Sequence, residues 1–163
     1  MPDAVDQPSF RYAMGHFATG VTVMTTGAGG RLHGMTVSAF ASVSLQPPLI
    51  LVCVEHSTLM HRLLAEPGGF AVNMLSERGE ATSRFFADNA RLDGPEFREG
   101  SYRMGVTGSP ILLEATAYLE ARIHSTHEAG DHTVVVGEVI ALEVVTEDEP
   151  LLFYRGGYRR LNG

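Results

Sequence analysis

The sequence predicts a mainly β protein whose strands form a closed or partly closed antiparallel barrel with a few short helices. Three observations lead to this class. About seven segments have strand-like composition against three short helix-like ones, and they lack the strand-helix alternation that produces a parallel sheet. The 18 glycines are spread along the 163 residues, as in turn-rich globular proteins. The length fits one domain, residues 1–163, in which we expect 1–8 to be a flexible tail.

The first elements are a helix and a hairpin. Ser9 is a suitable cap for a helix over 9–17, since the apolar residues Phe10, Ala13, Met14 and Phe17 recur at helical spacing. Residues 21–26 are short and β-branched, as strands are. The glycine cluster at 27–30 predicts a turn into a second strand at 32–37, and therefore a hairpin.

The middle of the chain alternates short strands and helices. Pro47 and Pro48 end the preceding segment, and the unbroken apolar run 49–54 predicts a strand buried on both faces, near the barrel centre. Ser57 and Thr58 predict the start of a helix that ends near residue 65, and a strand follows at 70–75. A second short helix is expected at 80–87.

The last third contains a long irregular segment and a long hairpin. Residues 88–110 mix charge, glycine and proline without periodicity, so we expect dimer contacts or a lid there. Residues 115–127 alternate apolar residues with Glu120, Arg122 and His124, and the turn at 129–131 leads into a strand at 133–145.

Charge and cysteine content exclude several classes of partner. The 12 Lys and Arg against 19 Asp and Glu give a net charge of -7, which disfavours general binding to nucleic acid or anionic membranes. The single cysteine, Cys53, permits no intrachain disulfide, which suits a reducing compartment. With no targeting or membrane-spanning segment recognised, we expect a cytoplasmic protein.

Several familiar motifs are missing. The glycines at 27–30 do not match a dinucleotide fingerprint, and Ser38 and Ser42 lack the flanking glycines of a nucleophile elbow. The histidines, among them His56, His61, His124 and His127, have spacings that surface residues reach by chance, so no metal is expected. Cys53, inside an apolar strand, is expected to be an inert core thiol.

The segment 34–44 is the most unusual part of the chain, because it alternates hydroxyl groups with small or apolar side chains just before an apolar strand. One interpretation is a polar edge strand. The other is a ligand cradle, in which short side chains admit a flat ring and hydroxyls donate hydrogen bonds. Ser57 and Thr58, with Arg84, form a second candidate, either an anion site or an ordinary helix cap beside a solvated arginine.

Taken together in one order, these residues resemble the short-chain flavin reductases, the reductase components of two-component flavin-dependent monooxygenases. The similarity extends over about residues 10–160 and is far more specific than any single motif. It rests on 17–21, 34–40, 42–44, 47–49, 57–58, 70–73, 130–132, 137–139 and 154–157.

The resemblance implies an FMN-binding split β-barrel, antiparallel and homodimeric, with a flavin near the dimer interface and no catalytic side chain beyond those that position the reactants. The residues that it implies for the flavin are Met35, Thr36, Val37, Ser38, Ala39, Ser42, Val43, Ser44, Cys53, Val54, Ser57, Thr58, Ser83, Arg84 and Phe85. For the nicotinamide nucleotide they are Phe17, Thr19, Asp131, His132, Tyr154 and Arg155. From sequence alone, His132 also fits a solvated turn residue.

The activity that the resemblance implies is hydride transfer from NADH or NADPH to FMN or FAD, with the reduced flavin reaching a separate monooxygenase by diffusion. Two alternatives stay open: a flavin-binding module of the same fold with little turnover, and a reductase that holds its flavin tightly and serves another acceptor. The sequence does not distinguish FMN from FAD or NADH from NADPH.

Overall fold

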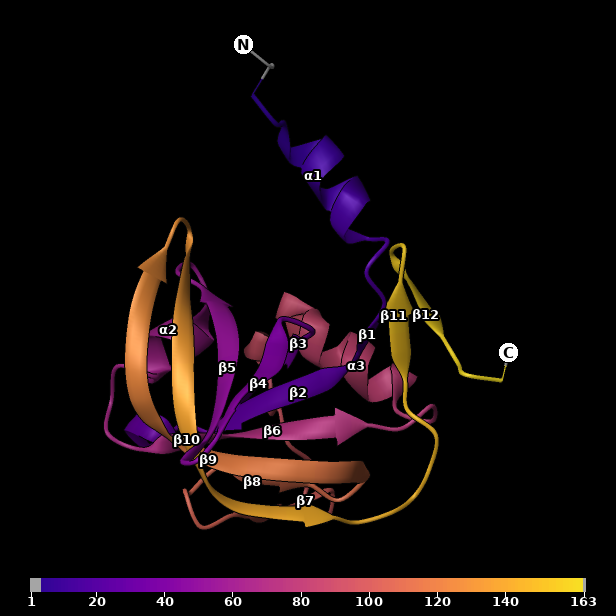
Figure 1. Ribbon diagram of the computed structural model, residues 1–163. Coiled ribbons are helices and arrows are strands. Elements are labelled where there is room, and N and C mark those ends of the chain that lie inside the picture. Colours follow the sequence, from indigo (N-terminus) through magenta and orange to yellow (C-terminus); the bar gives the residue numbers. More distant parts are fainter. Residues whose placement is uncertain (1–3, 163) are drawn as a thin grey trace.

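The computed structural model describes residues 4–162, and strands dominate them (Figure 1). The helical elements are α1 (Gln7–Met14), α2 (Leu59–Leu63) and α3 (Glu80–Ala87), with the 3-10 turns η1 (Ala28–Gly30) and η2 (Asn89–Asp93). The strands are β1 (Thr19–Gly20), β2 (Thr22–Thr26), β3 (His33–Val37), β4 (Phe40–Leu45), β5 (Pro48–Glu55), β6 (Gly69–Leu75), β7 (Tyr102–Met104), β8 (Pro110–Leu112), β9 (Ala115–Ala129), β10 (His132–Val144), β11 (Leu152–Tyr154) and β12 (Gly157–Arg159).

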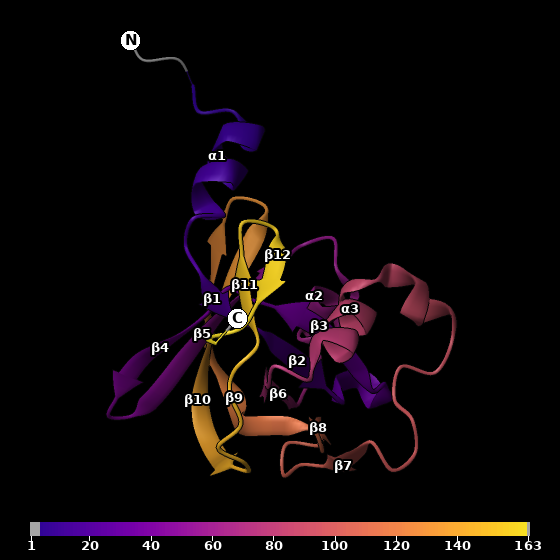
Figure 2. The same ribbon diagram turned by 90° about the vertical axis from the view of Figure 1, so that its right-hand side faces the viewer.

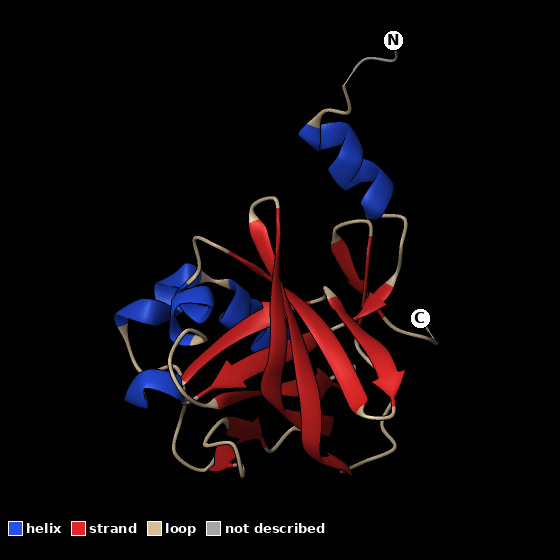
Figure 3. Cartoon of the chain, turned by 60° about the vertical axis from the view of Figure 1, so that its left-hand side comes forward, coloured by secondary structure: helices blue, strands red, loops and turns tan. Residues whose placement is uncertain are grey.

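A single sheet of seven strands, in the order β3-β2-β6-β9-β10-β5-β4, forms the body of the molecule, and its named pairs are antiparallel. Its two edge strands, β3 and β4, are consecutive in sequence and are separated only by Ser38 and Ala39. The chain therefore joins the two edges of the sheet at one corner. Figure 3 shows the strands crossing in a strongly twisted sheet, with α2 and α3 gathered on one side. The predicted mainly β, antiparallel class is confirmed.

The predicted hairpins are present. β2 pairs with β3 from Thr22↔Val37 to Thr26↔His33, and the turn between them contains Gly29 and Gly30 at positive φ. β9 and β10 form the expected long hairpin, which closes at Gly130, also at positive φ. Helix α3 has the predicted bounds. Among residues 4–162, no helix is long and apolar enough to cross a membrane.

The first helix lies further toward the N-terminus than expected. Its cap is Asp6, whose carboxylate accepts the Ser9 amide at 2.7 Å, and Pro8 in the first turn needs no hydrogen-bond acceptor. The helix ends at Met14 rather than at residue 17. Of the expected tail 1–8, residues 1–3 lie outside the described residues, and Gln7 and Pro8 already belong to α1.

Strand β5 is buried on one face only, so the prediction of burial on both faces was wrong. Ile50, Val52 and Val54 point into the main core, whereas Leu51 and Cys53 lie half-buried on the opposite face. The physical reason is that the outward side chains Leu51 and Cys53 face an open cavity instead of a packed layer. Cys53 is therefore not a core thiol.

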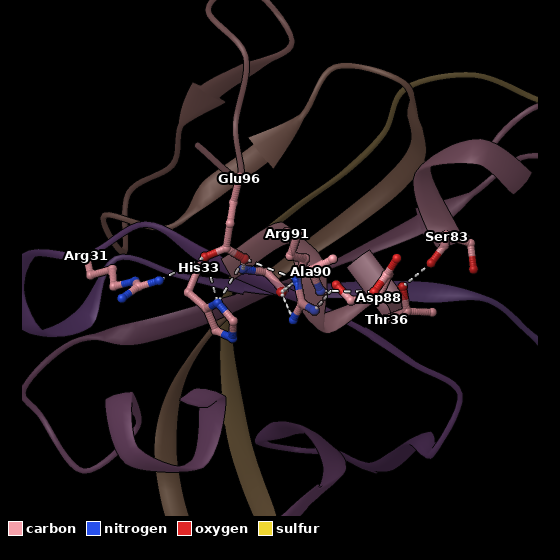
Figure 4. A network of polar contacts seen from close by, with 9 residues as sticks. Arg31, His33, Thr36, Ser83, Asp88, Ala90, Arg91 and Glu96 are labelled. Atoms are coloured by element: carbon pink, nitrogen blue, oxygen red, sulfur yellow. Dashed lines mark hydrogen bonds and ion pairs between the residues drawn. The ribbon is translucent and has the colours of Figure 1, made fainter. Parts of the chain in front are cut away.

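The segment 88–110 is held on the body by buried charges, instead of being free as a lid (Figure 4). Glu96 places its carboxylate oxygens 2.9 Å from Nδ1 of His33 and 3.2 Å from Nε of Arg91. Arg91 also donates to the carbonyl of Gly34, at 2.8 Å from its Nη2. All three ionisable side chains are at least nine-tenths buried, so the network fixes this segment against β3.

A second buried carboxylate fixes the far end of that segment. Glu120, one of the charged residues that alternate with apolar ones in β9, is 1% exposed and accepts hydrogen bonds from the backbone amides of Val106 and Thr107 and from the Thr107 hydroxyl. Its close approach leaves no room for a side chain at Gly105. The predicted alternation in β9 is correct at Glu120. The sequence does not show, however, that the loop containing Val106 and Thr107 covers the face on which Glu120 lies.

Candidate functional site

A cavity of about 820 Å³ opens between the base of α1, the β3–β4 corner and the β11–β12 hairpin, whose positions are seen in Figure 2. This volume is in the range of small-molecule and cofactor sites. The lining residues are Phe10, Arg11, Met14, Gly15, Phe17, Ala18, Thr19, Gly20, Thr22, Ser38, Ala39, Phe40, Ala41, Leu51, Cys53, Phe153, Arg155 and Gly156.

One wall of the cavity is the corner between β3 and β4, laid against the outer face of β5. The Cys53 amide donates to the carbonyl of Ala39 at 3.1 Å, and the Phe40 amide donates to the carbonyl of Ser38 at 2.9 Å. These bonds fix the corner beside Leu51 and Cys53, the outward side chains of β5. The side chains here are small or apolar, so a flat ring can lie close to the backbone.

The opposite wall comes from the two ends of the chain. Strand β1 pairs with β11 through Thr19↔Phe153, and the Arg155 amide donates to the carbonyl of Gly15 at 2.8 Å. Arg155 and Gly156 adopt positive φ in the turn to β12, which carries the Arg155 side chain to the cavity. Arg11 and Arg155 thus give an apolar cavity two exposed cations, as suits a ligand with an aromatic body and phosphate groups.

Thr19 supplies a specific observation in favour of a ligand. Its Oγ1 is buried and has no hydrogen-bond partner among the described residues, although Thr19 lines the cavity. A buried hydroxyl without a partner costs free energy, and a polar group of a bound molecule would remove that cost.

Six of the residues expected from the sequence meet in this cavity: Phe17, Thr19, Ser38, Ala39, Cys53 and Arg155. Their elements are distant in the chain, and the sheet topology brings them together. The β3–β4 corner is thus the part of the unusual 34–44 segment that faces the cavity.

Neighbours of these residues face elsewhere. The side chains of Val37 and Val54 are in the main core and Met35 packs against it, so Val37 and Val54 can approach a ligand only through backbone atoms. Thr36 donates its hydroxyl to the carbonyl of Ser83 at 2.7 Å. On β4, Ser42, Val43 and Ser44 lie around a register shift and outside the cavity lining.

The residues expected near phosphate are bound to the protein itself. The Ser57 hydroxyl donates to Glu55 at 2.9 Å, and Thr58 caps α2. On α3, the Ser83 hydroxyl lies 2.7 Å from that of Tyr158, and Arg84 pairs with Glu80 while its guanidinium stacks 4.8 Å from the Tyr158 ring. These contacts tie α3 to β12.

Phe85 lies on a different cavity, of about 630 Å³, formed by α3 and the segment that follows it. It shares that cavity with Phe86, with Phe97, and with Leu112 and Leu113 at the end of β8. Within residues 4–162, the two cavities share no lining residue.

The Asp131–His132 turn lies on the same face of the sheet as Cys53 but beyond the cavity lining. Cys53 pairs with Val134, two residues from His132, and alternate residues of a strand share a face. The Cα atoms of Cys53 and His132 are therefore about 8 Å apart. Nδ1 of His132 lies 2.7 Å from the Asp131 carboxylate, and this hydrogen bond, together with the imidazole charge, lowers the pKa of Asp131.

Tyr154 approaches the cavity from β11, next to Arg155, and its ring packs edge-on against that of His16 at 6.4 Å. It is half-buried and is not among the lining residues.

Sequence reasoning missed part of the lining: Phe10, Arg11, Met14, Phe40, Ala41, Leu51 and Phe153. A signal was available for two groups of them. Leu51 alternates with the inward residues of β5, and Phe10 and Met14 share the apolar side of α1 although no residue of that helix is buried.

The fold and this cavity define a flavin reductase-like protein. Residues 14–162 match the flavin reductase like domain, and the chain belongs to that family. It is 41% identical over 160 residues to an NADH-dependent FAD reductase of Streptomyces globisporus, covering 97% of this chain and 87% of that protein. It is 36% identical over 156 residues to the reductase subunit of a flavin-dependent monooxygenase of Rhodococcus jostii, covering 96% and 78% respectively.

Solved structures agree. The NADH:FAD oxidoreductase of Streptomyces globisporus, in complex with NAD and FAD fragments, superposes with a TM-score of 0.89 at 39% identity, over 98% of this chain and 96% of that one. The family and fold expected from the sequence are thus confirmed.

Proposed function

We propose that the chain is an NAD(P)H:flavin oxidoreductase that transfers a hydride from NADH or NADPH to FMN or FAD and supplies the reduced flavin to a partner monooxygenase. One observation carries the proposal. The β3–β4 corner and the outer face of β5 form a cavity of about 820 Å³, and the Asp131–His132 turn lies on the same face of the sheet. Relatives named as NADH-dependent flavin reductases and as reductase subunits of monooxygenases support the activity.

The cavity fits a flavin in size and chemistry. Its wall combines the small side chains Ser38, Ala39 and Ala41 with the apolar Phe40, Leu51 and Cys53, as suits an aromatic ring system. The unpartnered Thr19 hydroxyl and the exposed Arg11 and Arg155 offer a hydrogen bond and positive charge to the polar parts of the ligand.

When bound, the flavin supplies the hydride-accepting chemistry, and the residues of this chain position the reactants. Ser38, which lines the cavity, would offer a hydroxyl and a backbone amide to the negative charge of a reduced flavin bound there. Leu51, Cys53 and Phe40 exclude water from that wall. No nucleophile or strong base is required, since holding two rings at contact distance accounts for much of the rate.

We assign Asp131 and His132 to recognition of the nicotinamide nucleotide, together with Phe17, Thr19, Tyr154 and Arg155. The Asp131 carboxylate fixes the orientation of the imidazole, so that its other ring nitrogen points outward as a hydrogen-bonding group. The flavin phosphate is assigned to Arg11 or Arg155 ahead of Arg84, because Glu80 already pairs with Arg84.

We further propose that the enzyme is a homodimer and acts in the cytoplasm. Helix α1 has eight residues and buries none of them, and so short a helix is not stable alone in water. Its apolar residues Phe10 and Met14, with Phe17, are at least half exposed and line the open side of the cavity, where a second copy would complete the wall. The lone Cys53 suits a reducing compartment.

The test is NADH oxidation by catalytic amounts of protein, with and without added FAD or FMN. A diffusible reductase oxidises NADH through many turnovers, at a rate that saturates with added flavin. A rate independent of added flavin indicates a tightly held flavin. A protein that binds flavin without oxidising NADH or NADPH is a binding module, and this outcome contradicts the proposal.

A further inference from the structure

Two histidines and a glutamate from three separate elements converge near the turn of the β9–β10 hairpin, where His61 of α2 approaches Thr133 of β10. His56 follows β5, His61 belongs to α2, and Glu128 is near the end of β9. One ligand atom from each of the three lies within 4.8 Å of the others. From these residues we propose a binding site for a divalent transition-metal ion of the Zn²⁺ class, independent of the flavin cavity.

The donor atoms already face one another. Nε2 of His56 lies 2.8 Å from Oε2 of Glu128, and both imidazole rings present their Nε2 atoms to the Thr133 hydroxyl, at 3.2 Å for His56 and 2.9 Å for His61. Ligands of four-coordinate Zn²⁺ lie about 2.0–2.2 Å from the ion, and therefore about 3.3 Å from one another. Small side-chain rotations bring the three atoms to these separations.

The set of donors also has the right chemistry. Two imidazoles and one carboxylate are ligands that Zn²⁺ prefers, and they leave a fourth position for water. Thr133, only 4% exposed, donates to Oε1 of Glu128 at 2.9 Å. This hydrogen bond directs the other carboxylate oxygen of Glu128 toward His56. Metal-ligating side chains are commonly oriented by such hydrogen bonds from neighbouring residues.

The surroundings allow an ion to enter and to be retained. His56 and His61 are half-buried, with their rings 4.9 Å apart, while Glu128 is exposed and can move. An ion held here would join α2 and the end of β5 to β9, close to the Asp131–His132 turn. Sequence spacing could not reveal the site, because Glu128 is brought to the histidines by the β5–β10–β9 pairing.

The experiment uses chelator-treated, tag-free full-length protein titrated with Zn²⁺ by calorimetry. We expect one Zn²⁺ per chain, with affinity lowered at least about 10-fold in His61→Ala and in Thr133→Val. His124→Ala, an exposed histidine of the same hairpin, is the matched control and should bind as the wild type does. Co²⁺ in the same site should give the intense visible absorption of four-coordinate cobalt, and His61→Ala should abolish it.

Glu128→Gln keeps the test decisive if the histidine variants fold poorly, because the Glu128 side chain is largely exposed. It should fold normally and still bind Zn²⁺ at least about 10-fold more weakly. Zn²⁺ at 100 times the wild-type Kd should raise Tm of the wild type by about 5–10 °C and raise Tm of Glu128→Gln by no more than about half as much. Equal Zn²⁺ affinity in wild type, Glu128→Gln and His61→Ala, or no binding at all, overturns the proposal.

Discussion

Nδ1 of His33 lies 2.9 Å from both carboxylate oxygens of Glu96, and both side chains are almost completely buried. Burial by itself raises the pKa of Glu96, but the hydrogen bond and charge of His33, the Gly34 amide and Arg91 outweigh it, so that the pKa is lowered overall. This pair joins the irregular segment after α3 to β3, the strand that leads into the cavity corner.

Glu96→Gln should therefore destabilise the protein by about 3 kcal/mol at neutral pH, because it leaves Arg91 buried without its carboxylate. The expected fall in Tm is about 6–12 °C. Glu99→Gln, an exposed change on the same segment, is the control and should have little effect.

The difference in stability between the wild type and Glu96→Gln should depend on pH, because the pKa of Glu96 is lowered in the folded protein. Since the folded-state pKa of Glu96 is below the usual 4.5, its stabilisation is complete above about pH 4.5 and is lost as the pH falls further. The Tm difference between wild type and Glu96→Gln should narrow only in that acidic range. A constant difference down to the acid transition would show that the charge of Glu96 is unimportant.

Ala39→Leu tests the cavity wall. The side chain of Ala39 is exposed to the cavity, so a leucine there occupies the space proposed for the ring. FAD and FMN affinity, measured by fluorescence titration, should fall at least about 10-fold, equivalent to about 1.4 kcal/mol. Ala65→Leu, at an exposed alanine outside the cavity, should bind normally, and equal affinity in both variants argues against this wall as the flavin site.

His132→Ala tests the nicotinamide assignment. Loss of the oriented imidazole should raise KM for NADH at least several-fold and leave flavin affinity nearly intact. His127→Ala removes an exposed histidine of the same hairpin and serves as the control. Unchanged kinetics in His132→Ala would remove this residue from the site.

Phe10→Asp tests the proposed dimer. A carboxylate on the apolar side of α1 should weaken the association of two copies, and light scattering after size exclusion should show monomers at micromolar concentration. Gln7→Asp, in the same helix, should remain dimeric. A monomeric wild type would contradict the dimer but not the flavin cavity.

The sequence predicted the fold class and the hairpins well because these depend on local patterns. The glycine turn before β3, the Pro47-Pro48 break and the alternation in β9 each act within a few residues. The start of α1 was misplaced because Asp6 and Ser9 both suit a helix cap, and only the fold shows which one accepts the amide.

The sequence predicted only part of the candidate site, because the site combines segments that are distant in the chain. Ser38 and Cys53 were found because the resemblance marks their segments, and the structure brings both to one cavity. Leu51 was missed because a continuous apolar run predicts burial on both faces, whereas the outer face of β5 lines the cavity. The His33–Glu96 pair joins residues far apart in the chain, and no local pattern reports it.

The most direct test of the central claim is anaerobic stopped-flow mixing of the protein and FAD or FMN with NADH or NADPH. We expect loss of the visible absorbance of the oxidised flavin at roughly 10 turnovers per second, a typical enzymatic rate. A flavin that binds and stays yellow in the presence of both nucleotides would contradict it.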